Sequence, residues 1–300
     1  MRNILPTTRH LGIFVAGALA ALTIGGCGLT QAVPSVQETE DRTIKLIVTE
    51  SAPYQEPTEI ARELLAEDGW DLQPTYVTDI VQPNQVVSAG EYDANFFQHA
   101  AYLRQFNADN DTAVEPAFTV YDAPAGIFSL KYDTLAEQPQ KATISLPVDR
   151  SNNGRAIHLL AAEGLISIDE SVPVTELSQD AITDNPKDLQ FVEIDQQSSA
   201  QTLPDVDAGF STIRFQTEAG YDVEDTLLAF EDFDDPFDFT VVVGVAEGQR
   251  DSEKIQALEH ALHSPEVQDW YSDYLDGAIT FNGTYTTENI DQRWQTYLAE

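Results

Sequence analysis

Two aromatic side chains and a histidine follow a short apolar segment near residue 97, and together they suit the binding of a small molecule. Asp93 to Phe97 has the composition of a strand, and a helix is expected from His99 to Asn107. Phe97, His99 and Tyr102 then sit at or just past the carboxyl end of the strand, where open α/β sheets bind ligands. An aromatic wall of this kind suits a flexible thioether or aliphatic side chain.

The alternation of a strand limits which ring can face a ligand. Phe96 and Phe97 are successive strand residues, so they point to opposite faces and only one of them can face a given cleft. Phe96 is expected to pack in the core. Just upstream, Pro83 opens a short helix and Gly90 ends it.

A second candidate site is the stretch from Ser151 to Arg155, SNNGR, directly after another expected strand. Ser151 is a suitable N-cap, and the amides and dipole of the first helical turn favour an anion there. Arg155 in that turn is able to hold a carboxylate with two parallel hydrogen bonds. The alternative is a capped helix with a surface arginine.

Catalytic and metal-binding patterns are weak. The sequence contains no Gly-x-Ser-x-Gly elbow, Walker loop, dinucleotide fingerprint or HExxH motif. His99 has no spaced histidine or cysteine partner, and His260 and His263 lack a carboxylate or cysteine set. The acidic run 231–235 lacks the alternating ligands and the glycine of a calcium loop. We therefore expect a binding protein with no cofactor and no metal, and not an enzyme, since no nucleophile–base pair of a hydrolase is recognisable.

The elements that must position these residues alternate between strand and helix, which is the pattern of an α/β domain. The expected strands are 43–49, 74–77, 93–97, 112–121, 125–130, 142–146, 189–194, 208–211, 227–230 and 239–245. The expected helices are 58–67, 83–89, 99–107, 151–163, 252–263 and 265–275, with a further helix at 288–298. The strands form two sets, which suggests two lobes joined by crossings near 121–130 and 231–239.

The first 26 residues read as a lipoprotein signal peptide rather than as part of the fold. Two arginines precede an apolar stretch that is too short to span a bilayer comfortably, and small residues then precede Cys27. Cys27 is the single cysteine of the chain, so it is the expected lipidation site. Residues 27–42 then form a lipidated cysteine and a flexible tether. The alternatives are an uncleaved signal anchor and an ordinary secretory signal.

The chain is strongly acidic, with a formal net charge of −36 over 300 residues. Nucleic-acid binding favours basic surfaces, so nucleic acid is excluded as a partner. The acidity is best explained as a solvated surface that resists aggregation.

The segment VQPNQVVSAGEYDANFFQHAAYL closely resembles the signature of the NlpA/MetQ family, the substrate-binding lipoproteins of methionine-type ABC importers. A second resemblance is to the family stretch N-D-x-x-N-x-G-R, of which this chain keeps Asp149, Asn152, Gly154 and Arg155. The resemblance covers about residues 43–281. It implies a two-lobed α/β fold of the periplasmic-binding-protein type II (Venus-flytrap) class. The expected divisions are 43–125 for the first part of lobe 1, 126–232 for lobe 2, 233–281 for the return to lobe 1 and 282–300 for a C-terminal extension.

The resemblance also implies the binding site. Phe97, His99 and Tyr102 would form one wall, while Arg155 and Asn152 would meet the ligand carboxylate. Three positions depart from the family: Ile80 replaces a tyrosine, the Thr212–Arg214 segment replaces Asn-Thr-Asn, and Phe239 replaces an asparagine. Arg214 offers a second anion contact. The expected ligand-binding residues are Phe97, His99, Tyr102, Asn152, Arg155, Thr212, Arg214 and Phe239.

The resulting hypothesis is a lipid-anchored, monomeric receptor on the extracytoplasmic face of a bacterial membrane. By resemblance it delivers methionine or a related amino-acid-like carboxylate to an ABC permease with a separate cytoplasmic ATPase. Two alternatives remain open. One is the same fold with another amino acid, a dipeptide or a different carboxylate as ligand. The other is a surface lipoprotein with a vestigial cleft and no role in transport.

Overall fold

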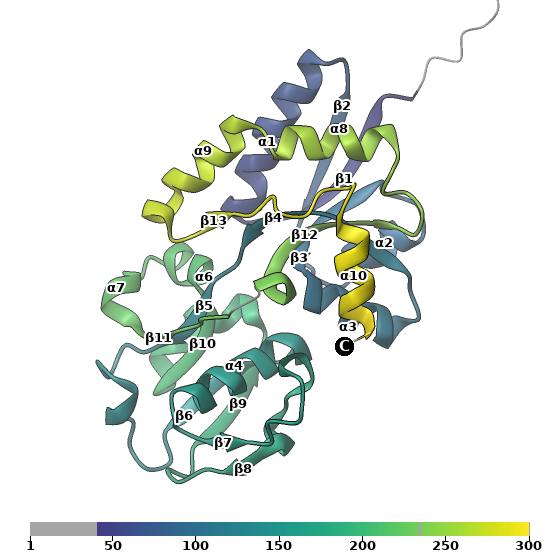
Figure 1. Ribbon diagram of the computed structural model, residues 1–300. Helices are drawn as coiled ribbons and strands as arrows, with labels where there is room; N and C mark the ends of the chain where they lie inside the picture. The colour runs from purple at the N-terminus through teal and green to yellow at the C-terminus, as the bar shows by residue number, and fades with distance from the viewer. Residues whose placement is uncertain (1–40, 234–235, 300) are drawn as a thin grey trace, which may run out of the picture. The chain divides into compact units, whose positions relative to one another are not determined.

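The structure is a computed structural model that describes residues 41–233 and 236–299 (Figure 1). The expected signal peptide 1–26, the lipidation site Cys27 and nearly all of the tether lie outside these residues. None of the helices in the described part of the chain combines the length and the apolar character that crossing a membrane requires.

The first sheet has six strands in the order β13-β4-β12-β3-β1-β2. Its strands are β1 (Thr43–Thr49), β2 (Asp71–Val77), β3 (Ala94–His99), β4 (Val114–Asp122), β12 (Thr240–Ala246) and β13 (Thr280–Phe281). β1 is parallel to β2 and β3, whereas β12 runs antiparallel to β3 and β4. β12 is buried along almost its whole length, as expected for an apolar strand in the middle of a covered sheet.

Helices cover both faces of this sheet (Figure 1). On one face α1 (Ala52–Glu67), α8 (Glu253–Leu262) and α9 (Pro265–Asp273) pack over apolar side chains of β1, β4 and β12. On the other face lie α2 (Gln82–Ser88), α3 (Ala100–Asn110) and α10 (Ile290–Ala299). The alternation within β1 supplies both cores, because Leu46 and Val48 face the first set of helices and Ile47 faces the second.

The second sheet has five strands in the order β11-β5-β10-β6-β9. Its strands are β5 (Ala125–Phe128), β6 (Thr143–Pro147), β9 (Gln190–Ile194), β10 (Ala208–Thr212) and β11 (Leu227–Phe230). The associated helices are α4 (Arg150–Ala162), α5 (Ser199–Thr202), α6 (Ile213–Glu218) and α7 (Val223–Thr226). β7 (Ser167–Ile168) and β8 (Ile182–Asp184) form a small separate ribbon. α4 contributes most of its apolar side chains to a core shared with β5, β6 and β10.

The chain passes between the two sheets twice. The first crossing is Ala123–Pro124, between β4 and β5, and the second is 231–239, between β11 and β12. The short first crossing brings the end of a strand in one sheet directly to the start of a strand in the other.

The starts of α1 and α4 show where a local sequence signal was misleading. α1 begins at Ala52, six residues before the expected Thr58, and it contains Pro57 in its interior. A proline there removes one backbone hydrogen bond near the helix start, and burial of its ring against the core accompanies that loss. α4 begins at Arg150 and is capped by Asp149, so the prediction of Ser151 as the N-cap is wrong.

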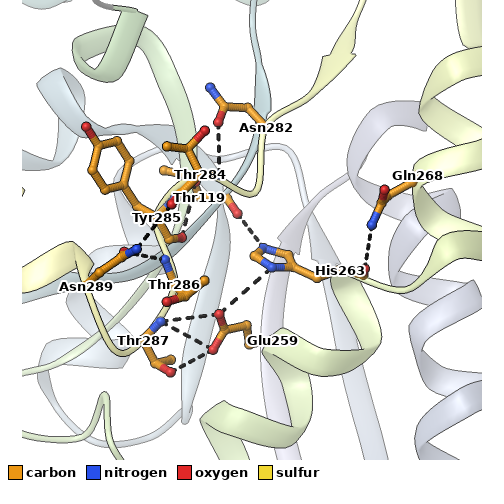
Figure 2. Close-up of polar contacts among 10 residues, drawn as sticks. All are labelled: Thr119, Glu259, His263, Gln268, Asn282, Thr284, Tyr285, Thr286, Thr287 and Asn289. Carbon is orange, nitrogen blue, oxygen red and sulfur yellow. Dashed lines mark hydrogen bonds and ion pairs between the residues drawn. The ribbon is translucent and has the colours of Figure 1, made fainter.

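The C-terminal extension folds onto the first sheet. The predicted extra helix is confirmed as α10, whose Ile290, Trp294 and Tyr297 are all buried. Residues 282–289 lead into it through polar contacts with the sheet and with α8 (Figure 2). Thr119 exchanges hydrogen bonds with the backbone of Tyr285 at 2.9 and 3.1 Å, and the Thr287 hydroxyl donates to Glu259 at 2.7 Å.

His263 belongs to the same contact group (Figure 2). Its Nε2 lies 2.7 Å from the carbonyl oxygen of Thr119, and its other nitrogen lies 3.9 Å from Glu259. Burial lowers the pKa of His263. This geometry gives His263 a structural role at the base of the extension.

We predict that α10 is an integral part of the first lobe. Replacing Trp294 with alanine removes a large side chain that is only 4% exposed, and the change is expected to lower the free energy of unfolding by about 3–5 kcal/mol. Leu298→Ala is the matched control on the exposed side of the helix, with an expected effect within about 0.5 kcal/mol. Urea unfolding measures both. Equal stabilities of the two variants would contradict the assignment.

Candidate functional site

A cavity of about 620 Å³ lies where the carboxyl ends of strands from both sheets meet. β1 and β3 of the first sheet contribute Thr49 and Phe97–His99 at their ends. From the second sheet come Asp149, just after β6, and Thr212, at the end of β10. The size is within the range that holds small-molecule ligands, and strand ends are the usual site of binding in open α/β sheets.

Phe97 and Tyr102 form an aromatic wall of this cavity. Their rings meet edge to face with centroids 5.8 Å apart, and the Tyr102 hydroxyl donates a 2.8 Å hydrogen bond to the carbonyl oxygen of Ile80. Phe96 points the other way and packs in the core, where its ring centroid lies 4.9 Å from that of Tyr54. The prediction that the two phenylalanines face opposite sides of the strand is confirmed, and Phe97 is the one in the cavity.

His99 joins the two lobes beside this wall. It is the last residue of β3 and the N-cap of α3, where its Nδ1 accepts the Tyr102 N–H at 3.1 Å. Because Nδ1 accepts, the proton of the neutral ring is on Nε2, which lies 3.2 Å from Oδ1 of Asn152. Burial, together with the positive charge of Arg155, lowers the pKa of His99 to about 3. A neutral ring with both nitrogens engaged is suited to positioning the cavity wall.

Three buried amides behind the wall were not singled out by the sequence. Asn84 of α2 and Asn95 and Gln98 of β3 hydrogen-bond to one another at 2.7–3.0 Å. β12 approaches them closely, since a Cβ on Gly244 would lie 2.7 Å from Oδ1 of Asn95. The available signal was the presence of three amides inside one short segment of buried elements. They fix α2 against β3 and thereby the strand end that carries His99.

The start of α4 already holds an anion of its own. Oδ1 of Asp149 accepts hydrogen bonds from the backbone of Asn152 at 3.0 Å, from its side chain at 2.9 Å and from the Ser151 hydroxyl at 3.0 Å. Burial raises the pKa of Asp149. The expected anion site on the first-turn amides is therefore occupied by this carboxylate, which itself lines the cavity.

Arg155 lies outside the wall of the large cavity, contrary to the sequence expectation. Its side chain is 2% exposed, and its Nε donates to Oε1 of Glu231 at 2.5 Å. Nη2 donates to the carbonyl oxygen of Ala123 at 2.6 Å. Arg155 and Glu231 line a separate cavity of about 250 Å³. The arginine thus connects α4 to both crossings between the sheets.

Phe239 lies close to both Arg155 and His99. Its ring lies 4.3 Å from the Arg155 guanidinium and 5.4 Å from the His99 ring. It lines the smaller cavity and not the larger one. Phe239, which is expected from the sequence to bind the ligand, therefore does not line the large cavity.

The other predicted positions do line the large cavity. Thr212 is buried there, and its hydroxyl has no hydrogen-bond partner among the described residues. Arg214 donates to the Ser51 hydroxyl at 2.8 Å, and its guanidinium lies 3.9 Å from the Phe215 ring. Six of the eight expected residues are thus brought together with Ile80: Phe97, His99, Tyr102, Asn152, Thr212 and Arg214.

Metal binding finds no support in the part of the chain that the structure covers. Within residues 41–233 and 236–299, no group of three or more histidine, aspartate or glutamate side chains is arranged to hold a metal ion.

Comparison with known proteins gives the family. The model of the NlpA lipoproteins matches residues 46–280, which is most of the chain. The chain belongs to the NlpA lipoprotein family. Its C-terminal helix α10 lies beyond the part that the family model matches.

Individual NlpA-type relatives agree with this assignment. The methionine-binding lipoprotein MetQ of Bacillus subtilis (strain 168) is 29% identical over 266 residues, which cover 87% of this chain and 96% of MetQ. A nutrient binding protein from Burkholderia cenocepacia, solved bound to methionine, has a TM-score of 0.75 at 26% identity and covers 80% of this chain and 99% of its own. A periplasmic substrate-binding protein of an ABC transporter from Coxiella burnetii has a TM-score of 0.73 at 26% identity. The match covers 80% of this chain and 100% of the Coxiella burnetii chain. The predicted two-lobed binding-protein fold is confirmed.

We predict that His99 makes this NlpA lipoprotein less stable in mild acid. The unfolded chain binds a proton at His99 near the ordinary pKa of 6.5, whereas the folded chain does so only near 3. Between these values the unfolded state binds more protons, so stability is full above pH 6.5 and is lost as the pH falls. His99→Asn retains an acceptor that can cap α3. Relative to this variant, the free energy of unfolding of the wild type should fall by about 1.4 kcal/mol between pH 7.5 and pH 5.5.

Urea unfolding at both pH values measures this difference. His260→Asn, on the exposed side of α8, is the control and should follow the wild type. The difference in free energy of unfolding between the wild type and His99→Asn should change between the two pH values. The same difference at both pH values would contradict a buried, neutral His99.

Proposed function

We propose that this chain is the lipid-anchored solute receptor of an ABC importer, and that it binds methionine or a related amino-acid-like carboxylate. The observation that carries the proposal is the 620 Å³ cavity between the strand ends of two lobes, with an aromatic wall on one side and polar groups on the other. Cys27 and the leader before it supply the anchor, on the extracytoplasmic face of the membrane.

The wall supports a ligand with a flexible apolar side chain. Phe97 and Tyr102 present ring edges and faces that contact a thioether or an aliphatic chain favourably. Asn152 and Thr212 offer polar groups on the opposite lobe. The methionine that the Burkholderia cenocepacia relative binds has both a thioether and a polar backbone.

Contacts across the cavity support a mechanism of closure. His99 and Arg214 each meet the other lobe, at Asn152 and Ser51, with distances of 3.2 and 2.8 Å. Gln197 also reaches across to the carbonyl oxygen of Thr78. A ligand that touches both walls binds the closed arrangement better than the open one and shifts the population toward it. The closed receptor would then dock on the permease, and a separate ATPase would supply the energy.

The altered positions favour a second possibility within the same class. Ile80, Thr212 and Arg214 line the cavity where the family resemblance leads us to expect tyrosine and asparagine, and Phe239 lies behind His99. A pocket changed at these positions is suited to a different amino acid, a dipeptide or another carboxylate.

We predict that the protein as purified, without refolding, is stabilised by at least one amino-acid-like carboxylate. A thermal-shift panel would contain L- and D-methionine, the other common amino acids, dipeptides and simple carboxylates. A ligand at 100 times its Kd adds about 2.7 kcal/mol to the free energy of unfolding. Native mass spectrometry identifies any co-purified molecule. Absence of both a shift and a co-purified solute would favour a lipoprotein with a vestigial cleft.

The aromatic wall can be tested with one matched pair. Tyr102→Ala removes the ring and should weaken binding of the best compound of the panel about 10-fold or more by calorimetry. Tyr102→Phe keeps the ring, loses only the hydrogen bond to Ile80, and should bind nearly as the wild type. Equal affinity in the wild type and Tyr102→Ala would contradict the placement of the ligand.

A further inference from the structure

Arg155 is poorly placed to receive a ligand from the large cavity. Its charge is neutralised by Glu231, which is itself only 4% exposed in its side chain. The Phe239 ring lies against its guanidinium at 4.3 Å, and the same ring packs 5.4 Å from the His99 ring. Breaking a buried ion pair to admit another anion is costly, because Glu231 would then remain buried without its counterion.

Arg214 has the opposite environment. Among the described residues that line the large cavity, it is the one arginine or lysine. It is partly exposed, and no described carboxylate forms an ion pair with it. One Nη1 hydrogen bond to Ser51 and stacking on Phe215 and Tyr54 orient the guanidinium. A guanidinium has five N–H donors, so an oriented fork with one protein contact retains donors for a bidentate partner.

The surrounding charges determine which ligand such an arginine would hold. Asp79, Asp149 and Asp195 line the same cavity. Asp149 is partly buried and follows β6 by two residues, just as Arg214 follows β10, and these two strands are parallel neighbours. A ligand that carries only negative charge would meet these carboxylates unfavourably. A zwitterion can place its carboxylate at Arg214 and leave its ammonium group among the aspartates.

We propose that Arg214, and not Arg155, holds the ligand carboxylate in this chain, and that the ligand is a zwitterion with a free carboxyl group. Arg155 is then a structural residue that joins α4 to the two crossings. The proposal rests on the proposed function, since it assigns a binding group within the same cavity.

The experiment compares paired probes on paired variants. The probes are the free α-amino acids of the thermal-shift panel and their carboxamides, beginning with L-methionine and L-methioninamide. The proteins are the wild type, Arg214→Gln, Arg214→Lys and the control Arg62→Gln. Arg62 is exposed and lies on α1, so its replacement removes the same charge away from the cavity.

We expect wild type and Arg62→Gln to bind a free amino acid equally. Arg214→Gln should weaken that binding about 10- to 100-fold, because a charged hydrogen bond contributes about 1.5–3 kcal/mol. Arg214→Lys, which lacks the planar fork, should recover only part of the loss. The carboxamide should bind the wild type weakly, because it has no carboxylate for Arg214 to hold. Arg214→Gln should therefore weaken binding of the carboxamide little further.

Three results would overturn the assignment to Arg214. One is retention of wild-type affinity for the free amino acid by Arg214→Gln. The second is an equal further loss for amino acid and carboxamide, which would indicate a structural effect. The third is stabilisation of the wild type by carboxamides alone. If neither probe class nor any other member of the panel stabilises the wild type, the proposed function itself fails.

Discussion

The buried ion pair between Arg155 and Glu231 is the interaction on which the arrangement of the two sheets depends. Arg155 extends from α4 of the second sheet, while its partners Glu231 and Ala123 lie on the two crossings to the first. Phe239 closes the other side of the guanidinium at the start of β12. Removing one member of a buried ion pair lowers the free energy of unfolding by about 3–5 kcal/mol. Because Arg155 contacts both crossings, the ion pair constrains the two connections together. Ends of strands from different sheets can form one cavity because these connections are held in place.

The segment with the strongest family resemblance performs two separate tasks. Asn84, Asn95 and Gln98 form a buried amide network in which most polar atoms find partners, as buried polar groups require. This network fixes α2 against β3, and Asn84 and Asn95 within it are fully buried. The neighbouring Phe97 and His99 emerge from the same strand into the cavity. One part of the signature therefore specifies the fold and another part forms a wall of the cavity, and resemblance alone does not distinguish the two.

The sequence predicted strands well and side-chain partners poorly, for a physical reason. β1 and β11 begin and end where expected because their apolar patterns are local properties of the chain. The start of α1 was missed because burial of Pro57 outweighs a local helix-stop signal. The orientation of Arg155 depends on Glu231, 76 residues away. Phe97, His99 and Asn152 could be placed from strand and helix ends, whereas the direction of a long arginine requires tertiary contacts.

The departures from the family at Phe239 and Arg214 are best understood together. A phenylalanine at position 239 lies against the guanidinium of Arg155, and both residues line the smaller cavity and not the larger one. Without another cation, the cavity would then present Asp79, Asp149 and Asp195 to a ligand carboxylate and repel it. Arg214 restores a positive charge at the neighbouring strand end, oriented by Ser51 and Phe215. Under the assignment that we propose, binding of a carboxylate in this chain requires the arginine at 214 because of the phenylalanine at 239.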